Sequence, residues 1–172
     1  QAINEMPEEF FEKFYLEITG PGETQYINKI KKMIKIFKIE DSVSIQPPKT
    51  GKNKIIYLQS SDIFILPSYE EGDSIALKEA MSAGNAVIIS EQCRLNLVED
   101  EKAGIIVKTD KNSIKRALNK IKDFNLDEMG ENSKKIMHKY FENDFCSDRV
   151  LKIYEDIHTG SVNSKDWIEK NE

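Results

Sequence analysis

Apolar positions along the chain follow two spacings, one typical of buried strands and one typical of amphipathic helices. Short, nearly continuous apolar runs bounded by glycine, proline or polar residues predict strands. Apolar residues three and four positions apart predict helices with one buried face. The predicted strands are 14–20, 41–48, 62–68, 85–90 and 103–109, and the predicted helices are 23–37, 52–61, 75–83, 111–123, 127–141 and 144–158.

This order of elements predicts an α/β fold. A strand is followed by a helix about four times, and the strands are apolar along most of their length. Such strands are buried on both faces, which is typical of a parallel sheet covered by helices on both sides. The sequence therefore predicts a Rossmann-like, doubly wound domain over residues 1–158. A polar tail or crossing helix is expected over residues 159–172, with Val162, Trp167 and Ile168 as its apolar residues.

Composition narrows the class of protein. The chain has 172 residues, of which 39% are hydrophobic and 32% are charged, as is normal for a globular domain. Its net charge of −5 gives no basic footprint, so we expect no nucleic-acid partner. Only two cysteines occur, and no apolar run approaches the length of a membrane span, which favours a cytoplasmic location. The first residues enter helix-like sequence without an initiator methionine, so we expect the chain to be part of a longer protein.

One stretch, residues 67–90 (PSYEEGDSIALKEAMSAGNAVIIS), places polar residues where such a fold binds ligands. In doubly wound sheets the ligand lies outside the carboxyl ends of the strands. A predicted strand ends here, and the loop with Glu71 and Gly72 follows it. Gly72 allows a close backbone approach or a φ that other residues resist. Asp73 or Ser74 can cap the next helix, whose free N–H groups suit a phosphate or a sugar oxygen.

The helix that follows contains a second carboxylate, Glu79, and is expected to end at Gly84. Glu79 lies on a different side of the helix from the predicted buried stripe of Leu77, Ala80 and Met81. The two oxygens of its carboxylate match the paired hydroxyls of a ribose. The simpler interpretation is a solvated glutamate paired with a nearby lysine, and spacing alone favours it. For Glu71, the simpler interpretation is a carboxylate that complements the helix dipole.

The same stretch resembles the donor-site motif of retaining nucleotide-sugar glycosyltransferases with the two-domain GT-B architecture. In that family a Glu-Gly pair follows a strand ending in Pro-Ser, and seven residues separate the first glutamate from a second. The residues in register are Glu71, Gly72, Glu79, Ala80, Met81 and Gly84. The segments ITGPGE, SSDIFILPS and LVEDEKAGIIV are also similar to the family, so the resemblance covers residues 14–122.

The resemblance implies roles for the loop and the helix start. Glu71 would be the catalytic residue, lying against the donor sugar and holding its hydroxyls. The backbone N–H groups from Gly72 through Asp73 and Ser74 to Ile75 would contact the sugar or the diphosphate. The family often has Phe-Gly where this chain has Asp73 and Ser74. The added charge of Asp73 favours contacts with sugar hydroxyls over phosphate at that residue.

The resemblance also implies contacts with the nucleoside. Glu79 would bind the ribose hydroxyls. The turn after the strand at 41–48 would form a wall for the base, with main-chain contacts near Lys49. Pro47 stands in that turn where the family usually has a glycine. In the family, a phosphate-binding arginine and lysine precede the segment that this chain matches, as does the amino-terminal domain that binds the acceptor.

The function implied is that of the donor-binding half of a retaining glycosyltransferase. It would move a hexose from a nucleoside-diphosphate sugar to a hydroxyl acceptor, in the synthesis of bacterial surface polysaccharide or glycoconjugate. The chain alone is expected to be inactive, because the acceptor, a glycan, a lipid-linked compound or another alcohol, binds to the other domain. The donor is a substrate, so no cofactor is expected, and without an Asp-x-Asp pair we expect no metal site. The full-length enzyme would associate peripherally with the inner face of the plasma membrane.

Two alternatives stay open at this point. A dinucleotide-binding domain of an oxidoreductase predicts a Gly-x-Gly-x-x-Gly turn after its first strand, whereas GPGETQY lacks the third glycine. A non-catalytic domain of the same fold would have lost the site. The presence of both Glu71 and Glu79 argues against that loss, while Ser74 and Pro47 leave it open.

Overall fold

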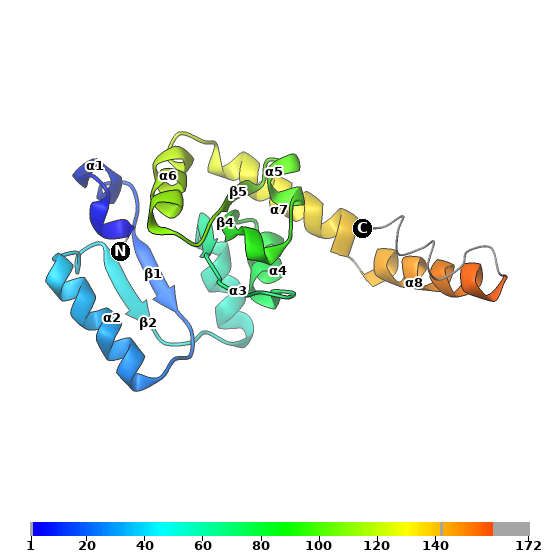
Figure 1. Ribbon diagram of the computed structural model, residues 1–172, viewed down its shortest axis with the longest axis horizontal. Coiled ribbons are helices and arrows are strands. Elements are labelled where there is room, and N and C mark those ends of the chain that lie inside the picture. The colour runs from blue at the N-terminus through cyan, green and yellow to red at the C-terminus, as the bar shows by residue number, and fades with distance from the viewer. Residues whose placement is uncertain (1, 142, 160–172) are drawn as a thin grey trace. The chain divides into compact units, whose positions relative to one another are not determined.

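The computed structural model describes residues 2–141 and 143–159, and the chain divides into two compact units, Gln1–Lys134 and Lys135–Glu172 (Figure 1). The strands are β1 (Leu16–Thr19), β2 (Val43–Gln46), β3 (Ile63–Leu66), β4 (Ala86–Ser90) and β5 (Gly104–Val107). The α-helices are α1 (Glu8–Phe11), α2 (Thr24–Phe37), α3 (Gly51–Gln59), α4 (Ile75–Ala83), α5 (Leu97–Asp100), α6 (Lys111–Ile121), α7 (Leu126–Phe141) and α8 (Asn143–His158). Two 3-10 helices, η1 (Ile3–Glu5) and η2 (Glu91–Cys93), complete the described elements.

All strand pairs of the described residues are parallel, as the apolar strands predict. β1 pairs with β2, and β3, β4 and β5 form a second sheet in that order. The α/β, Rossmann-like architecture is therefore confirmed. The single sheet expected from the sequence is observed as two sheets, because no strand of the described residues pairs with the second edge of β1 or of β3.

The main core lies on one face of the three-stranded sheet. The register places Ile65 beside Ile88 and Ile88 beside Ile105, so these side chains share a face. The N-terminal segment, α6 and the start of α7 pack on that face. The buried cluster consists of Ala2, Met6, Phe10, Ala86, Ile88, Ile105, Val107, Ala117, Leu118, Ile121 and Met129. α4 contacts β3 and β4, and α5 contacts β5.

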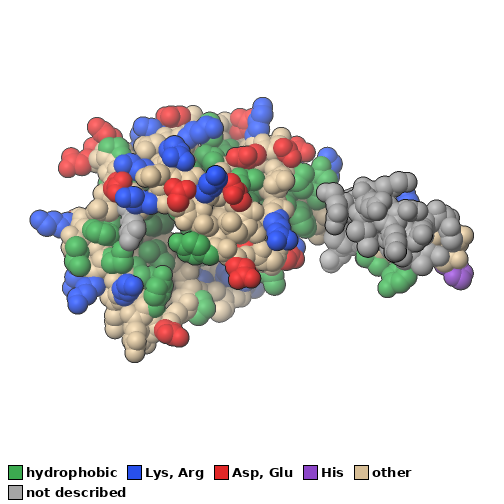
Figure 2. Space-filling view, in the orientation of Figure 1, with side chains coloured by type: hydrophobic (Ala, Val, Ile, Leu, Met, Phe, Trp, Pro, Cys, Tyr) green, Lys and Arg blue, Asp and Glu red, His purple; other side chains and the backbone are tan. Residues whose placement is uncertain are grey.

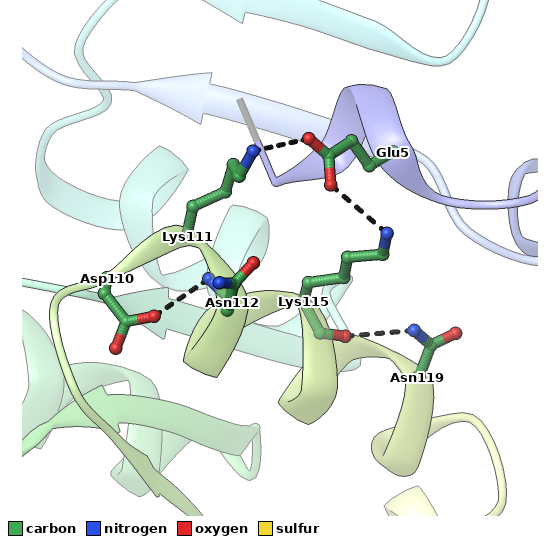
Figure 3. A network of polar contacts seen from close by, with 6 residues as sticks. All are labelled: Glu5, Asp110, Lys111, Asn112, Lys115 and Asn119. Carbon is green, nitrogen blue, oxygen red and sulfur yellow. Dashed lines mark hydrogen bonds and ion pairs between the residues drawn. The ribbon is translucent and has the colours of Figure 1, made fainter.

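An ion-pair network fixes the N-terminal segment to α6 (Figure 3). The carboxylate of Glu5, at the end of η1, accepts hydrogen bonds from Lys111 Nζ at 2.6 Å and from Lys115 Nζ at 3.2 Å. These bonds hold the pKa of the Glu5 carboxyl below its ordinary value. Asp110 caps α6 by accepting from two backbone N–H groups of the first turn, each at 2.9 Å. The segment before β1 is therefore an integral part of the first unit.

The end of α4 makes a close contact with α7. A Cβ atom added at Gly130 would lie 2.0 Å from the carbonyl oxygen of Gly84, so the two backbones touch where glycine has no side chain. Close by, Ser133 Oγ donates to the carbonyl oxygen of Asn85 at 2.7 Å. The first turns of α7 are thus fixed to the segment that connects α4 with β4.

The two long C-terminal helices agree with the predicted ones to within a residue at each end. The tail with Val162, Trp167 and Ile168 lies outside the described residues, so the expected tail or crossing helix and the boundary at residue 158 stay predictions. No helix of the described ranges is long and apolar enough to cross a bilayer. On the face drawn in Figure 2, Lys and Arg side chains are interspersed with Asp and Glu over the first unit, without a large area of one sign.

Candidate functional site

The loop between β3 and α4 carries most of the predicted site residues, and its base is anchored to neighbouring elements. Ser90 Oγ, at the end of β4, donates to the carbonyl oxygen of Ser68 at 2.7 Å. Cys93 Sγ, in η2, lies 3.9 Å from the carbonyl oxygen of Leu66, the last residue of β3. The loop therefore leaves the sheet from a fixed point at the carboxyl ends of two parallel strands.

α4 begins at a side-chain cap. Of the two predicted caps, Ser74 is the one observed, because its Oγ accepts from the N–H of Leu77 at 3.3 Å. The N–H groups of Ile75 and Ala76 have no intrahelical acceptor, as in the first turn of any helix. Among the described residues they have no other acceptor, so they are available as donors beside the loop. At the other end, α4 ends at Gly84 as expected, and Gly84 has a left-handed φ of 95°.

Asp73 forms an ion pair instead of a cap. Both of its carboxylate oxygens lie 2.6 Å from Lys78 Nζ. The Asp73 side chain is 73% exposed, so water screens this pair strongly. The ammonium group nevertheless offsets part of the negative charge that Asp73 adds near the helix start. That charge was expected to disfavour phosphate at this position.

The sequence suggested two reasons for a glycine at position 72, an unusual φ or a close approach of the backbone to a ligand, and the structure tests the first. The φ of Gly72 lies outside the left-handed region, and an added Cβ would meet no heavy atom within 4 Å. The observed backbone conformation therefore does not require glycine. Close approach of a ligand, the other reason, stays a prediction. Glu71, directly before it, is half-buried.

Glu79 contacts a second helix. Lys54 Nζ of α3 lies 2.5 Å from Glu79 Oε1, and the two side chains are 37% and 35% exposed. A lysine partner is what the simpler interpretation predicted, and this lysine lies on another helix. The buried stripe of α4 is confirmed as Leu77, Ala80 and Met81. The sequence held no signal for Lys54, because the pair depends on how α3 packs on α4.

The turn after β2 forms the other part of the candidate site. Thr19 Oγ1, at the end of β1, donates to the carbonyl oxygen of Pro47 at 3.1 Å. Lys49 Nζ lies 5.5 Å from the centre of the Tyr57 ring on α3. Burial, followed by a hydrogen bond to the Glu17 carboxylate, raises the pKa of Tyr57 to about 12. A shallow pocket of ≈ 270 Å³ lies here, lined by Lys49, Asn53, Ile56, Tyr57 and Ser60.

These contacts connect the predicted residues only in part. The turn at Lys49 contacts α3, and α3 contacts Glu79 on α4. Within the described part of the chain, no hydrogen bond or ion pair joins Lys49 to Glu71 or to Glu79. The same residues contain no group of three or more His, Cys, Asp or Glu side chains that could hold a metal ion.

Asn85 holds α3 in place, a role that sequence reasoning missed. The residue follows the end of α4 and is only 1% exposed. Its Nδ2 donates to the carbonyl oxygen of Leu58 at 2.8 Å and also to that of Ser61. A polar residue at the start of an apolar strand was the only available signal. Asn85 therefore fixes the end of the helix that carries Lys54 and Tyr57.

Comparison with known proteins identifies the family. The model of the family described as Glycosyl transferases group 1 matches residues 1–142. An uncharacterized glycosyltransferase from Haemophilus influenzae is 36% identical over 73 residues, which is 42% of this chain and 20% of that protein.

Two solved structures are similar in fold. Sucrose-phosphate synthase from Thermosynechococcus elongatus matches with a TM-score of 0.74 and 20% identity, over 92% of this chain and 41% of that one. Anabaena Alr3699/HepE in complex with UDP-glucose matches with a TM-score of 0.73 and 15% identity, over 90% and 43%. This chain spans less than half the length of these proteins. The family match covers most of the chain and agrees with the resemblance drawn from the motif, so the chain belongs to the glycosyl transferases group 1 family.

Proposed function

We propose that the chain is the donor-binding half of a retaining glycosyltransferase that moves a hexose from a nucleoside-diphosphate sugar to a hydroxyl acceptor. The observation that carries this proposal is the loop with Glu71 and Gly72, which leads from the carboxyl end of β3 into a capped helix. Family membership supports transferase chemistry. The UDP-glucose in the similar HepE structure supports a nucleotide sugar as the donor.

The proposed chemistry at the sugar is electrostatic. Glu71 would hold hydroxyls of the hexose as the catalytic residue, and backbone N–H groups from Gly72 to Ile75 would bind the sugar or the diphosphate. Donors that are fixed before the reaction stabilise the charge that develops on the leaving diphosphate. The uncapped N–H groups at the start of α4 and the lysine beside Asp73 support this assignment.

The nucleoside would lie over the two helices next to this loop. Glu79 would accept hydrogen bonds from the ribose hydroxyls. The turn at Lys49, which contacts Tyr57, would form the wall for the base. The oxidoreductase alternative has lost its support, because the family match points to a transferase.

The wider biological role follows from the resemblance alone. We place the full enzyme in the synthesis of bacterial surface polysaccharide or glycoconjugate, in the cytoplasm and peripherally at the inner face of the plasma membrane. A glycan, a lipid-linked compound or another hydroxyl acceptor would bind to a second domain. This chain would then bind donor without transferring sugar, and the proposal needs no cofactor, metal ion or nucleic acid.

A ligand-observed NMR titration tests the proposal, because this method detects weak binding. UDP, GDP, ADP and NAD are each titrated into the unaltered chain, into Glu79→Ala and into Glu70→Ala. Glu70 is the matched control, since it is an exposed carboxylate in the same loop and has no proposed role. We expect saturable binding of one nucleoside diphosphate, lost in Glu79→Ala and kept in Glu70→Ala.

Binding of NAD alone would contradict the proposal, as would equal binding by all three proteins. If none of the three proteins binds any of the nucleotides, the result would favour the non-catalytic alternative. UDP-glucose, GDP-mannose and ADP-glucose, titrated into Glu71→Gln, then test the sugar side. Glu71→Gln is expected to weaken binding of the nucleotide sugar while leaving binding of the free diphosphate unchanged.

A further inference from the structure

We propose that Lys54 pairs with Glu79 in the recognition of adjacent hydroxyl groups, both by holding the Glu79 carboxylate and by donating to one hydroxyl, and so selects ribose over deoxyribose. This inference rests on the proposed function and adds a residue to it. Lys54 Nζ lies 2.5 Å from Glu79 Oε1, although the two residues belong to different helices. No motif in the sequence includes Lys54.

The contact leaves part of each charged group free for a ligand. Glu79 uses only Oε1, and within the described residues Oε2 has no protein partner. An ionised carboxylate accepts through both of its oxygens, and an ammonium group has three donors, of which this contact uses one. A hydroxyl could therefore donate to Oε2 while its neighbour accepts from Lys54 Nζ. The pair offers one acceptor and one donor side by side, as an adjacent pair of hydroxyls requires.

Both side chains stand on elements that are fixed to each other. Asn85 follows the end of α4, and its buried amide donates to the carbonyl oxygen of Leu58 near the end of α3. Lys54 lies four residues before Leu58, so the two side chains lie on one face of α3. The Lys54 ammonium is therefore held over α4 by the packing of the two helices as well as by its charge.

The partial exposure of the pair suits recognition rather than simple stability. At 37% and 35% exposure the two side chains are accessible to a ligand, and an ion pair at this exposure stabilises a fold only slightly. A glutamate that is already held in one rotamer loses less conformational freedom when a ligand binds. Lys54 would thus strengthen the contact with the ribose hydroxyls and leave contacts with the base and the diphosphate unchanged.

The experiment compares dissociation constants for ribose and dideoxyribose ligands within each variant. The probes are UDP, GDP and ADP with their 2′,3′-dideoxy counterparts, and the base that the unaltered chain binds most tightly is used throughout. We expect the unaltered chain to favour the ribose form by about tenfold or more. In Lys54→Met this ratio is expected to fall below about threefold, and in Lys54→Arg to recover, because a guanidinium group can also hold the carboxylate.

Lys52→Met is the matched control, since it removes an exposed lysine from the first turn of the same helix. A variant that is partly unfolded binds both ligands less well by the same factor, so the ratio separates positioning from a structural role. An unchanged ratio in Lys54→Met, or an equal loss in Lys52→Met, would overturn the inference.

The two proposals fail in different ways. If the unaltered chain binds no nucleoside diphosphate, or if Glu79→Ala binds as well as the unaltered chain, both are wrong. If Glu79→Ala loses the preference for ribose and Lys54→Met keeps it, only the role of Lys54 is wrong.

Discussion

Gly72 and Gly130 occupy opposite environments. An added Cβ at Gly72 would meet no heavy atom within 4 Å, whereas at Gly130 it would lie 2.0 Å from a backbone oxygen of Gly84. Substitution by alanine tests both environments, because it adds only a Cβ atom with its hydrogens. That atom has room at Gly72 and has none at Gly130.

Alanine at Gly72 is expected to affect binding but not folding. Since the site is open, Gly72→Ala should leave the free energy of unfolding unchanged or raise it by up to about 1 kcal/mol. The same Cβ would obstruct the backbone N–H groups that we assign to the donor, so the affinity for a nucleotide sugar should fall by about tenfold or more. Chemical denaturation and NMR titration measure the two effects, and an unchanged affinity would remove Gly72 from the proposed site.

Alanine at Gly130 is expected to destabilise the fold, although alanine favours helices by about 1 kcal/mol over glycine. The added Cβ would force α7 away from the end of α4, and overpacking of this kind costs about 1–3 kcal/mol. We therefore expect Gly130→Ala to lower the free energy of unfolding measured by chemical denaturation. A more stable variant would mean that helix propensity outweighs the contact with Gly84.

Tyr57 gives a prediction at high pH. Burial and the hydrogen bond to Glu17 raise its pKa from 10.0 to about 12, so the protonated phenol is favoured in the folded chain. Its stabilising contribution is complete below the ordinary pKa of 10.0 and is lost as the pH rises through about 12. In a spectrophotometric titration, Tyr57→Phe should remove a component that ionises at a pH of about 12. Glu17→Gln should shift that component only part of the way down, because burial is the larger cause.

At the scale of elements, α4 and β4 show how accurately the sequence predicts the bounds of helices and strands. The predicted helix bounds of 75–83 are those observed, because a serine cap, an apolar stripe and a glycine delimit the helix locally. The predicted strand 85–90 begins one residue before the observed β4, because periodicity does not separate Asn85 from the strand. η2 and α5 were not predicted, because three or four residues are too few to show a helical spacing. η1 and α1 lie in the first residues, which the sequence indicated as helix-like without giving bounds.

In the candidate site, too, the positions set by local pattern could be predicted, and those set by the packing of helices could not. Ser74 and Glu79 follow from local pattern, and their places on α4 agree with it. Lys54 could not be predicted, because the packing of one helix on another sets its distance to Glu79. The same holds for Glu5, whose lysine partners lie more than a hundred residues away.

The pairing of Glu5 with α6 predicts a loss of stability in acid. Its lysine partners lower the pKa of Glu5 below 4.5, so the contribution of this carboxylate is present above that pH and is lost as the pH falls through the lowered pKa. Glu5→Gln should therefore have a lower thermal midpoint than the unaltered chain at about pH 7, and this difference should shrink as the pH falls through the lowered pKa. A difference that does not change with pH would show that the contribution of Glu5 does not depend on its charge.

At the scale of the whole molecule, the two parallel sheets explain why the predicted single sheet was not found. Continuous apolar runs indicate that strands are buried and parallel, but they do not say which edges pair. Among the described residues, the second edges of β1 and of β3 have no partner strand. Edge pairing is thus the level of organisation that the pattern of residues leaves undetermined.

The buried amide of Asn85 has a consequence for motion across the first unit. This amide donates to the carbonyl oxygens of Leu58 in α3 and of Ser61 just after α3, and Asn85 follows Gly84 at the end of α4, so we expect local opening of either helix to disturb the same hydrogen bonds. The two helices should therefore open and close as one cooperative unit in hydrogen exchange. A nucleotide held at Glu79 would then slow amide exchange along α3 as well as along α4, including turns of α3 that the nucleotide never touches.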